Sequence, residues 1–402
     1  MAKIDDSVKK KVPELRFKGF TDDWEERKLG DEVRIVMGQS PNSENYTDDP
    51  NDYILVQGNA DMKNGRVFPR VWTTQVTKQA EKDDLILSVR APVGDIGKTA
   101  YDVVIGRGVA AIKGNEFIFQ NLGKMKSDGY WTRYSTGSTF ESINSTDIKE
   151  AIISVPTIEE QNKIGSFFKQ LDNTIALHQR KLDLLKEQKK GFLRKMFPKN
   201  GAKVPELRFA GFADDWEERN LGEWSDVRDG THASPKYIKQ GHPMVTSKNL
   251  TDSGLDMSDV SYLTDEDFNE INQQSKVDIG DILFGMIGTI GKPVIVDRDD
   301  FAIKNVALIK EKTSPEIINT WLIQYLKSPS FERFIQKENA GGTQKFIALG
   351  LIRDMKLMTP SVQEQARIGE LLNHLDNLIV ANQRKLDLLK EQKKGYLQKM
   401  FA

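Results

Sequence analysis

Only a few segments of this 402-residue chain combine residue types in a way that could support chemistry. The segment GDIGKT at 94–99 is similar to a phosphate-binding loop, but such a loop needs four residues between its glycines and this segment has two. A related segment, GTIGKP at 288–293, also lacks the hydroxyl residue after its lysine. We therefore interpret both as strand–turn–strand segments that carry a surface lysine, Lys98 or Lys292.

The sequence lacks the residue sets of common catalytic centres. It contains no cysteine and only four histidines, and the histidines do not have the spacing of paired metal ligands. It has no Gly-x-Ser-x-Gly segment and no His-Glu-x-x-His segment. An Asn-Pro-Pro-aromatic segment, of the kind used to flip and methylate adenine, is also missing. These observations predict a chain that is not an enzyme and that holds no metal.

Short polar side chains beside glycines are the strongest candidates for binding. Their hydroxyl, amide and ammonium groups suit hydrogen bonds to phosphates and base edges, and the arginines of the first half suit guanine. Each loop taken alone is more often an ordinary turn. The candidate DNA-binding residues are Gln39, Ser40, Asn42, Arg66, Arg70, Arg90, Lys98, Arg107, Ser138, Thr139, Thr231, Ser234, Lys236, Tyr237, Lys248, Asn249, Lys292, Thr343 and Lys345.

A scaffold must position these loops, and the sequence shows one as an internal repeat. The segment QRKLDLLKEQKKG occurs at Gln179–Gly191 and again, letter for letter, at Gln383–Gly395. Each copy ends a longer match, Pro156–Phe197 and Pro360–Phe401, at a constant offset of 204 residues. In both copies apolar residues recur at alternating steps of four and three, which is typical of a coiled-coil seam.

We expect the two copies to form long helices that pair with each other. About 40 periodic residues make a rod about 60 Å long, and a rod of that length needs a partner. The alternative is an amphipathic helix that packs only on its own domain. Polar residues interrupt both seams at the same two positions, His178 with Asn382 and Lys189 with Lys393. The predicted pairing residues are Leu171, Ile175, Leu182, Leu185, Leu375, Ile379, Leu386 and Leu389.

A second repeat opens each half of the chain. Twenty residues from Val12 and twenty from Val204 agree at 16 positions, at an offset of 192. The two offsets differ by 12 residues. The central segments that separate each opening from its helix, called the middles below, therefore differ in length by 12 residues. These middles share little sequence, which suggests a common scaffold that presents two different recognition surfaces. An old duplication in which one domain drifted is the alternative.

Both middles are expected to be α+β domains of the same fold. Strand-like segments alternate with Gly, Pro and Asn turns, and AAIK at 110–113 aligns with ALIK at 307–310. Helices are predicted at Glu116–Lys126 and Pro315–Gln336. The predicted strands are Tyr53–Gln57, Asp84–Val89, Ala110–Lys113, Met244–Ser247, Asp281–Phe284, Lys292–Val296 and Val306–Ile309.

Composition sets further limits. The fractions of 38% hydrophobic and 29% charged residues predict a soluble protein whose domains have hydrophobic cores. No apolar run has the length of a membrane span. The first residues, MAKIDDSVKKK, lack the apolar segment of a signal peptide, so we expect a cytoplasmic protein. The net charge is −1, yet nine basic residues stand against two acidic ones from Gln179 to Lys203. A face that meets DNA or a protein partner would explain this local excess.

The chain resembles the specificity (S) subunit of type I restriction–modification systems over essentially its whole length. The paired VPELRF…DDWEER openings and the paired LDLLKEQKKG helices carry the resemblance, together with GTHASPKY, TSKNL and GDILFGMIGTIGK of the second half. It implies an α+β fold in which two similar target recognition domains are separated by two long helices that pair as an antiparallel coiled coil, with pseudo-twofold symmetry. The expected parts are an N-terminal segment (1–23), the first domain (24–155), the central helix and linker (156–203), the second domain (204–359) and the C-terminal helix (360–402).

The resemblance also implies a function and partners. Each domain would read one half of a bipartite target in double-stranded DNA, and the helices would set the gap between the halves. Two methyltransferase (M) subunits, which bind S-adenosylmethionine, and two ATP- and Mg-dependent restriction (R) subunits would be the partners. This chain would itself bind no cofactor and no membrane. A methyltransferase fused to its reader and a coiled-coil scaffold without DNA affinity remain the alternatives.

Overall fold

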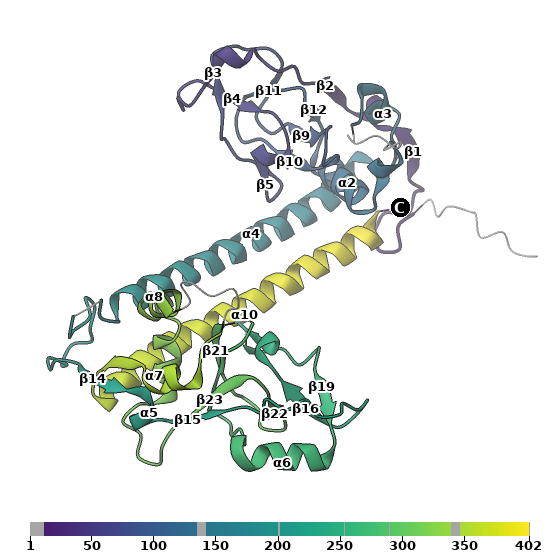
Figure 1. The fold of residues 1–402 in the computed structure, drawn as a ribbon. Coiled ribbons are helices and arrows are strands. Elements are labelled where there is room, and N and C mark those ends of the chain that lie inside the picture. The colour runs from purple at the N-terminus through teal and green to yellow at the C-terminus, as the bar shows by residue number, and fades with distance from the viewer. Residues whose placement is uncertain are drawn as a thin grey trace, which may run out of the picture. The chain divides into compact units, whose positions relative to one another are not determined.

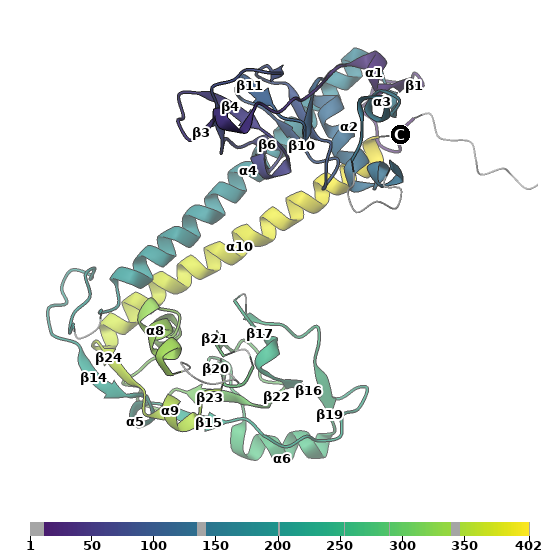
Figure 2. The same ribbon diagram turned by 45° about the horizontal axis from the view of Figure 1, so that its top comes forward.

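Two units make up the fold, and each contains one mixed α/β domain together with parts of two long helices (Figures 1 and 2). The first unit combines Met1–His178 with Leu386–Ala402, and the second is Gln179–Lys385. The long helices are α4 (Ile158–Lys195) and α10 (Val362–Met400), each of which belongs partly to both units. The computed structural model describes residues 12–134, 142–199, 202–252, 254–288, 290–338 and 346–401.

The first domain has a six-stranded sheet, β2-β12-β9-β10-β6-β5, and a five-stranded sheet, β3-β7-β4-β11-β8, while β1 pairs with β13. Its strands are β1 (Glu25–Lys28), β2 (Arg34–Met37), β3 (Tyr46–Thr47), β4 (Tyr53–Val56), β5 (Met62–Lys63), β6 (Arg66–Val67), β7 (Trp72–Thr73), β8 (Gln79–Ala80), β9 (Leu85–Ser88), β10 (Ile96–Lys98), β11 (Val103–Ile105), β12 (Val109–Lys113) and β13 (Ile152–Val155). Its helices are α1 (Leu29–Glu32), α2 (Glu116–Ser127) and α3 (Ser145–Lys149), with 3₁₀ turns η1 (Ser43–Asn45), η2 (Asn59–Asp61) and η3 (Tyr130–Tyr134).

The second domain repeats this framework. Its four-stranded sheet, β15-β23-β20-β21, matches β2-β12-β9-β10, and its three-stranded sheet is β19-β16-β22. The strands are β14 (Glu217–Asn220), β15 (Asp226–Asp229), β16 (His242–Val245), β17 (Leu250–Thr251), β18 (Gly254–Leu255), β19 (Ser261–Leu263), β20 (Ile282–Gly285), β21 (Gly291–Ile295), β22 (Ala302–Ile303), β23 (Val306–Lys310) and β24 (Lys356–Thr359). The helices are α5 (Leu221–Trp224), α6 (Asp265–Ser275), α7 (Asn319–Tyr325), α8 (Pro329–Glu338) and α9 (Leu349–Arg353), with the 3₁₀ turn η4 (Ser247–Asn249).

The predicted α+β fold and its repetition are thus confirmed, with two differences in detail. The second domain is longer in two places: it has the 11-residue helix α6 between β19 and β20, where the first has only the short strand β8, and it has a longer loop between β23 and α7 than the first has between β12 and α2. The single helix predicted at Pro315–Gln336 is wrong, because the segment forms α7 and α8. Pro329 lacks a backbone N–H and disfavours helical backbone at the residue before it, so α7 ends and a new helix starts at the proline.

The GxxGK segment of the first domain forms the predicted strand–turn–strand structure, and the second segment, whose Thr289 lies outside the described residues, leads into β21. Strand β10 pairs antiparallel with β9, with Ile96 opposite Leu87, and β21 pairs with β20 in the second domain. The Thr99 hydroxyl, which a phosphate loop would direct to a ligand, is buried and donates to the Tyr101 carbonyl at 2.7 Å.

The repeated openings clamp the long helices. In the first unit, Arg16 donates two hydrogen bonds of 2.7 Å to Glu160, whose side chain is fully buried in the first turn of α4. In the second unit, Arg208 forms the same pair with Glu364 of α10, again with both distances 2.7 Å. Bidentate pairs of this kind fix geometry as well as contribute energy. The arginine that both openings share is therefore explained by the same contact in each unit.

Within each unit, α4 and α10 lie side by side and run antiparallel (Figures 1 and 2). In the first unit, Lys393 of α10 binds Asp172 of α4 at 2.6 Å, and Gln120 of α2 donates to the same carboxylate at 2.8 Å. In the second unit, Lys189 of α4 binds Asp376 of α10 at 2.5 Å, and Gln324 of α7 donates to it at 3.0 Å.

These contacts explain why lysines interrupt the apolar seams. Each lysine joins the two helices, while the glutamine joins the domain to the same aspartate. Burial lowers the pKa of Lys189, and the charge of Asp376 opposes that effect. Of the predicted pairing residues, Leu182, Leu185, Leu375, Leu386 and Leu389 are buried, whereas Leu171, Ile175 and Ile379 are half-buried.

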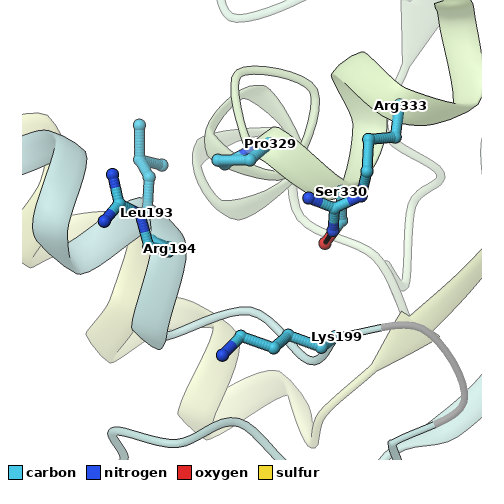
Figure 3. A pocket seen from close by; sticks show the side chains of 6 residues that line it. All are labelled: Leu193, Arg194, Lys199, Pro329, Ser330 and Arg333. Carbon is cyan, nitrogen blue, oxygen red and sulfur yellow. Dashed lines mark hydrogen bonds between the residues drawn. The ribbon is translucent and has the colours of Figure 1, made fainter.

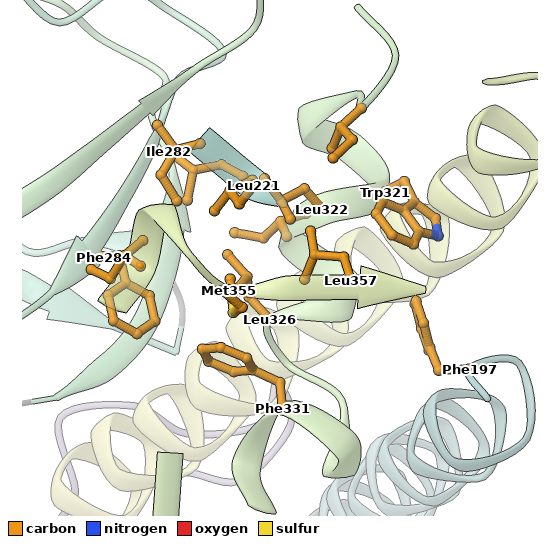
Figure 4. Packing of buried hydrophobic residues seen from close by; sticks show 14 of the residues in the cluster. Phe197, Leu221, Ile282, Phe284, Trp321, Leu322, Leu326, Phe331, Met355 and Leu357 are labelled. Atoms are coloured by element: carbon orange, nitrogen blue, oxygen red, sulfur yellow. The ribbon is translucent and has the colours of Figure 1, made fainter. Parts of the chain in front are cut away.

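A phenylalanine at the end of each long helix completes the core of one domain. Phe401 stacks on Phe117 with the ring centroids 5.0 Å apart and meets Trp24 edge to face at 6.3 Å. Its counterpart Phe197 lies 6.1 Å from Trp321, measured between ring centroids (Figure 4), and 6.4 Å from Trp216. The first domain therefore needs the end of α10, and the second needs the end of α4. None of the helices among the described residues is long and apolar enough to cross a membrane.

Candidate nucleic-acid interface

Three loops of the first domain meet where β2, β4 and β11 end. The backbone N–H of Gln39 donates to the Ile105 carbonyl at 2.8 Å. The Ser40 hydroxyl accepts a hydrogen bond from the backbone N–H of Arg107 at 3.1 Å. A Cβ atom on Gly108 would lie 2.0 Å from the Gln57 carbonyl oxygen, so only glycine allows these loops to approach this closely. The first loop cluster comprises Gln39, Ser40, Asn42, Gln57 and Arg107.

Most of this first loop cluster faces solvent. Gln39, Asn42 and Arg107 are exposed, while Ser40 and Gln57 are half-buried. The Arg107 guanidinium forms no hydrogen bond or ion pair with the described residues. The cluster therefore offers an unpaired guanidinium among amide and hydroxyl groups, a combination suited to base edges and phosphates. The structure thus brings Arg107 to Gln39, Ser40 and Asn42, from which it is distant in the sequence, and adds Gln57.

The second domain builds a cluster on the same backbone framework. The Thr231 amide donates to the Ile303 carbonyl at 3.0 Å, as Gln39 does to Ile105, and the Gly230 amide bonds to Val306 as that of Gly38 bonds to Val109. The Lys304 ammonium donates to the Ser234 hydroxyl at 2.8 Å. The second loop cluster comprises Thr231, His232, Ser234, Lys304 and Asn305.

His232 organises this second loop cluster. Its imidazole contacts the Asn305 side-chain oxygen at 2.7 Å and an Asp229 carboxylate oxygen at 2.8 Å. These two hydrogen bonds, that with Asn305 first, raise the pKa of His232 above its ordinary value of 6.5. Asn305 has a φ of 56°, a conformation that asparagine tolerates better than most residues. Asn305 thereby turns the chain between β22 and β23 toward the histidine.

Lys304, Asn305 and His232 were not among the sequence candidates. The repeat contained the signal, because AAIK at 110–113 aligns with ALIK at 307–310 and Arg107 precedes the first of these segments as Lys304 and Asn305 precede the second. An arginine in one copy and a lysine in the other would have marked corresponding positions.

A strip of exposed residues follows β6 in the first domain. Arg66, Phe68 and Arg70 are exposed while Val67 between them is buried, as the alternation of a strand requires. Phe68 is 56% exposed, which is unusual for so large an apolar side chain, and the Arg70 guanidinium donates to the Ala60 carbonyl at 2.9 Å. An aromatic ring between two arginines is a combination found in surfaces that contact nucleic acid. Phe68 was not among the sequence candidates either.

Other candidates lie apart from the loop clusters. Arg90, Lys236, Tyr237 and Lys292 are exposed. Lys98 is half-buried, with its ammonium 3.5 Å from Glu116 and 3.9 Å from Asp83, and Lys248 pairs with Asp259 at 2.8 Å.

Asn249 has a structural position in η4. Its side chain is 3% exposed, and its amide donates to the carbonyls of Asp256 and Asp259 while its oxygen accepts from the Thr246 amide. These contacts hold the loop and leave the side chain little freedom to meet DNA. Ser138, Thr139, Thr343 and Lys345 lie outside the described residues.

The described residues contain no group of three His, Cys, Asp or Glu side chains that could hold a metal. The chemistry that both loop clusters offer is hydrogen bonding and charge. Their donors and acceptors differ between two otherwise corresponding frameworks, which suits the recognition of two different surfaces.

Comparison with known proteins matches each half of the chain, a domain with most of the long helix that follows it, to the same family. A model of the type I restriction modification DNA specificity domain matches residues 21–187 and again residues 213–391. The chain is 22% identical to the type I restriction enzyme MjaVIII specificity subunit of Methanocaldococcus jannaschii, over 93% of this chain and 91% of that protein. A protein of the same organism that is provisionally named as the MjaX specificity subunit is 32% identical over 42% of this chain and 41% of its own length.

The fold is also found in a solved structure. The S subunit of a type I restriction–modification system from M. genitalium aligns over 97% of this chain and 99% of its own, with a TM-score of 0.69 at 16% identity. This similarity extends across both domains and both long helices.

Proposed function

Because the chain belongs to the type I restriction–modification DNA specificity family, with two copies of its domain, we propose that it reads a bipartite target in double-stranded DNA. Each loop cluster contacts one half of that target. Family membership assigns the chain to the non-catalytic recognition component. The two matched segments leave only short stretches of this chain for anything else, which argues against a fused methyltransferase.

One observation carries this proposal. The two loop clusters share their backbone hydrogen bonds but not their side chains, since Ser40 and Arg107 stand in one and His232, Lys304 and Asn305 in the other. A coiled-coil scaffold without DNA affinity would have no use for two differently equipped copies of one framework.

Exchange of one domain tests the proposal. Residues 24–155 are replaced by the same region of another family member, and the chain is assembled with M subunits and S-adenosylmethionine. Mapping of methylated adenines should then show one half-site changed and the other retained. A change in both half-sites, or in neither, would contradict independent reading by the two domains.

We further propose that the paired helices set the gap between the half-sites. The antiparallel contacts of α4 with α10 in both units support this role. Four residues inserted after Leu185 add about one helical turn, or about 6 Å. The gap should grow by about one or two base pairs, at about 3.4 Å each, while both half-sites stay the same. Methylation of the original target with its original gap would show that the helices do not set the distance between the half-sites.

Repeated leucines on the long helices suit the docking of M subunits. Leu184 is 68% exposed, and Leu388, at the same position of the second repeat, is 47% exposed. The same exposed leucine at the same position of both repeats would give two copies of one partner equivalent contacts. Replacing either leucine with Glu should reduce the number of M subunits recovered with the chain from two to one, and the double variant should recover none. Glu187→Gln, an exposed change on the same helix, serves as the control.

The partner subunits would supply the chemistry. S-adenosylmethionine would bind to the M subunits, and ATP and Mg to the R subunits, as the sequence resemblance implies. The cytoplasmic location expected from the sequence stays a prediction.

A further inference from the structure

A basic pocket of about 290 Å³ lies in the second unit, and none of the residues of the second loop cluster line it (Figure 3). Leu193 and Arg194 come from the last turns of α4, and Lys199 follows that helix. The opposite wall is the start of α8, with Pro329, Ser330 and Arg333. The proposed reading of DNA by the loops does not use any of these residues.

Three cationic side chains line this pocket, and none of its six lining residues is acidic. Lys199 has a partner, the carboxylate of Glu206, and Arg333 donates to the Ser330 hydroxyl at 3.2 Å. The Arg194 guanidinium forms no hydrogen bond or ion pair within the described part of the chain. Glu206 offsets the charge of Lys199 but not that of the two arginines, so the cavity keeps a positive charge that an anion would offset. The pocket therefore has the charge of an anion site.

The donors match a phosphate group better than a carboxylate. Two guanidinium groups and one ammonium line the pocket from separate segments. The Ser330 hydroxyl donates to the Pro198 carbonyl at 3.1 Å and accepts a hydrogen bond from Arg333, so it orients that arginine. A phosphate has enough oxygens for several such donors, whereas one arginine already satisfies a carboxylate. The first turn of α8 adds the favourable dipole of a helix start.

The sequence repeat shows that the unpaired arginine of this pocket has no counterpart in the other copy. LDLLKEQKKGFLRKMF at 182–197 and LDLLKEQKKGYLQKMF at 386–401 differ at two positions, Phe192 with Tyr396 and Arg194 with Gln398. The single charge difference between the two copies thus falls on the unpaired arginine of the pocket. A helix of this sequence tolerates glutamine there, as the second copy demonstrates.

We infer that Arg194, Lys199 and Arg333 form a binding site for a phosphate group. The group comes either from the backbone of bound DNA or from a free phosphate compound. The DNA source rests on the proposed function, whereas the free source does not.

The first experiment measures phosphate binding by the full chain without DNA. Sodium phosphate is titrated calorimetrically at constant ionic strength, with sodium acetate as the comparison. Saturable phosphate binding that weakens about tenfold in Arg194→Gln supports the site, since a charge-assisted hydrogen bond contributes about that much. Lys186→Gln, which removes the same charge from an exposed position of α4, should bind as the wild type does. Arg333→Gln provides a second test, and melting curves check that every variant is folded.

The second experiment distinguishes the two sources. The affinity for duplex DNA is measured across salt concentrations for the chain assembled with M subunits. A salt slope reduced by about one in Arg194→Gln, with both half-sites unchanged, assigns the pocket to the DNA backbone. An unchanged slope together with weakened phosphate binding assigns it to a free phosphate compound.

Two results would overturn the site itself. One is the absence of saturable phosphate binding by the wild type together with the same salt slope in all variants. The other is acetate binding as tight as phosphate binding. Failure of the chain to bind DNA would contradict the proposed function but would leave the phosphate titration interpretable.

Discussion

The clamps of the two units and their loop clusters repeat in different ways. Arg16 with Glu160 and Arg208 with Glu364 form the same bidentate pair at the same distance of 2.7 Å. At the loops, backbone hydrogen bonds repeat but side chains do not, because Arg107 in one unit corresponds to Lys304 and Asn305 in the other. The difference shows that one frame is built twice from identical residues, while each copy presents its own donors and acceptors.

The largest effect should come from the aromatic residues that complete each core. Phe197→Ala and Phe401→Ala each remove a buried ring and should cost about 3–5 kcal/mol of stability. Among the described residues, the aromatic contacts of Phe197 lie in the second unit and those of Phe401 in the first, so hydrogen exchange should accelerate in one unit at a time. Phe68→Ala, at an exposed position, should change stability by less than about 0.5 kcal/mol. Equal acceleration in both units from either core variant would show that the two cores are not separate.

The lysines of the helix seams should have smaller and unequal effects. Side-chain exposure is 10% for Lys189 and 28% for Asp376, but 23% for Lys393 and 31% for Asp172. Lys189→Met should therefore cost about 2 kcal/mol in urea unfolding, because it leaves a partly buried carboxylate without its cation, and Lys393→Met should cost less. Adding Asp376→Asn to Lys189→Met should restore part of the loss. Equal costs for the two lysine variants would exclude burial as the cause.

The smallest effect concerns pH and His232. Hydrogen bonds to Asn305 and Asp229 raise its pKa in the folded chain above 6.5. The stabilisation is therefore fully present below pH 6.5 and is lost as the pH rises through the higher folded value. The wild type should exceed His232→Gln in free energy of unfolding by more at pH 6 than at pH 8. The difference should be less than about 1 kcal/mol because solvent screens this exposed ring. NMR titration that gives an ordinary or lowered pKa for His232 would contradict this geometry.

The sequence predicted the frame better than the recognition surface. The helix repeats carried strong periodicity and the openings agreed at 16 of 20 positions, so the pairing of α4 with α10 and the duplicated α+β domain were predicted from sequence patterns alone. The seam lysines were visible as interruptions, but their partners Asp376 and Asp172 depend on the register between two distant segments. The loop clusters depend on how the ends of β2, β4 and β11 approach one another, and no local pattern reports that. Asn249 shows the opposite case, because its polar type suggested DNA while its buried position gives it a structural role.

The two loop clusters are proposed to recognise separate halves of the target. The most direct test of this proposal compares Arg107→Ala with Lys304→Ala. Each variant is assembled with M subunits, and methylated adenines are mapped across a library of bipartite targets. Each change should cost about 1–3 kcal/mol of discrimination at one half-site if the side chain contacts a base, with the other half-site and the gap unchanged. Arg107→Ala should relax only the half-site read by the first domain, and Lys304→Ala only that read by the second. If both variants relaxed the same half-site, or if neither changed the methylation pattern, the assignment of the two loop clusters to separate halves of the target would be wrong.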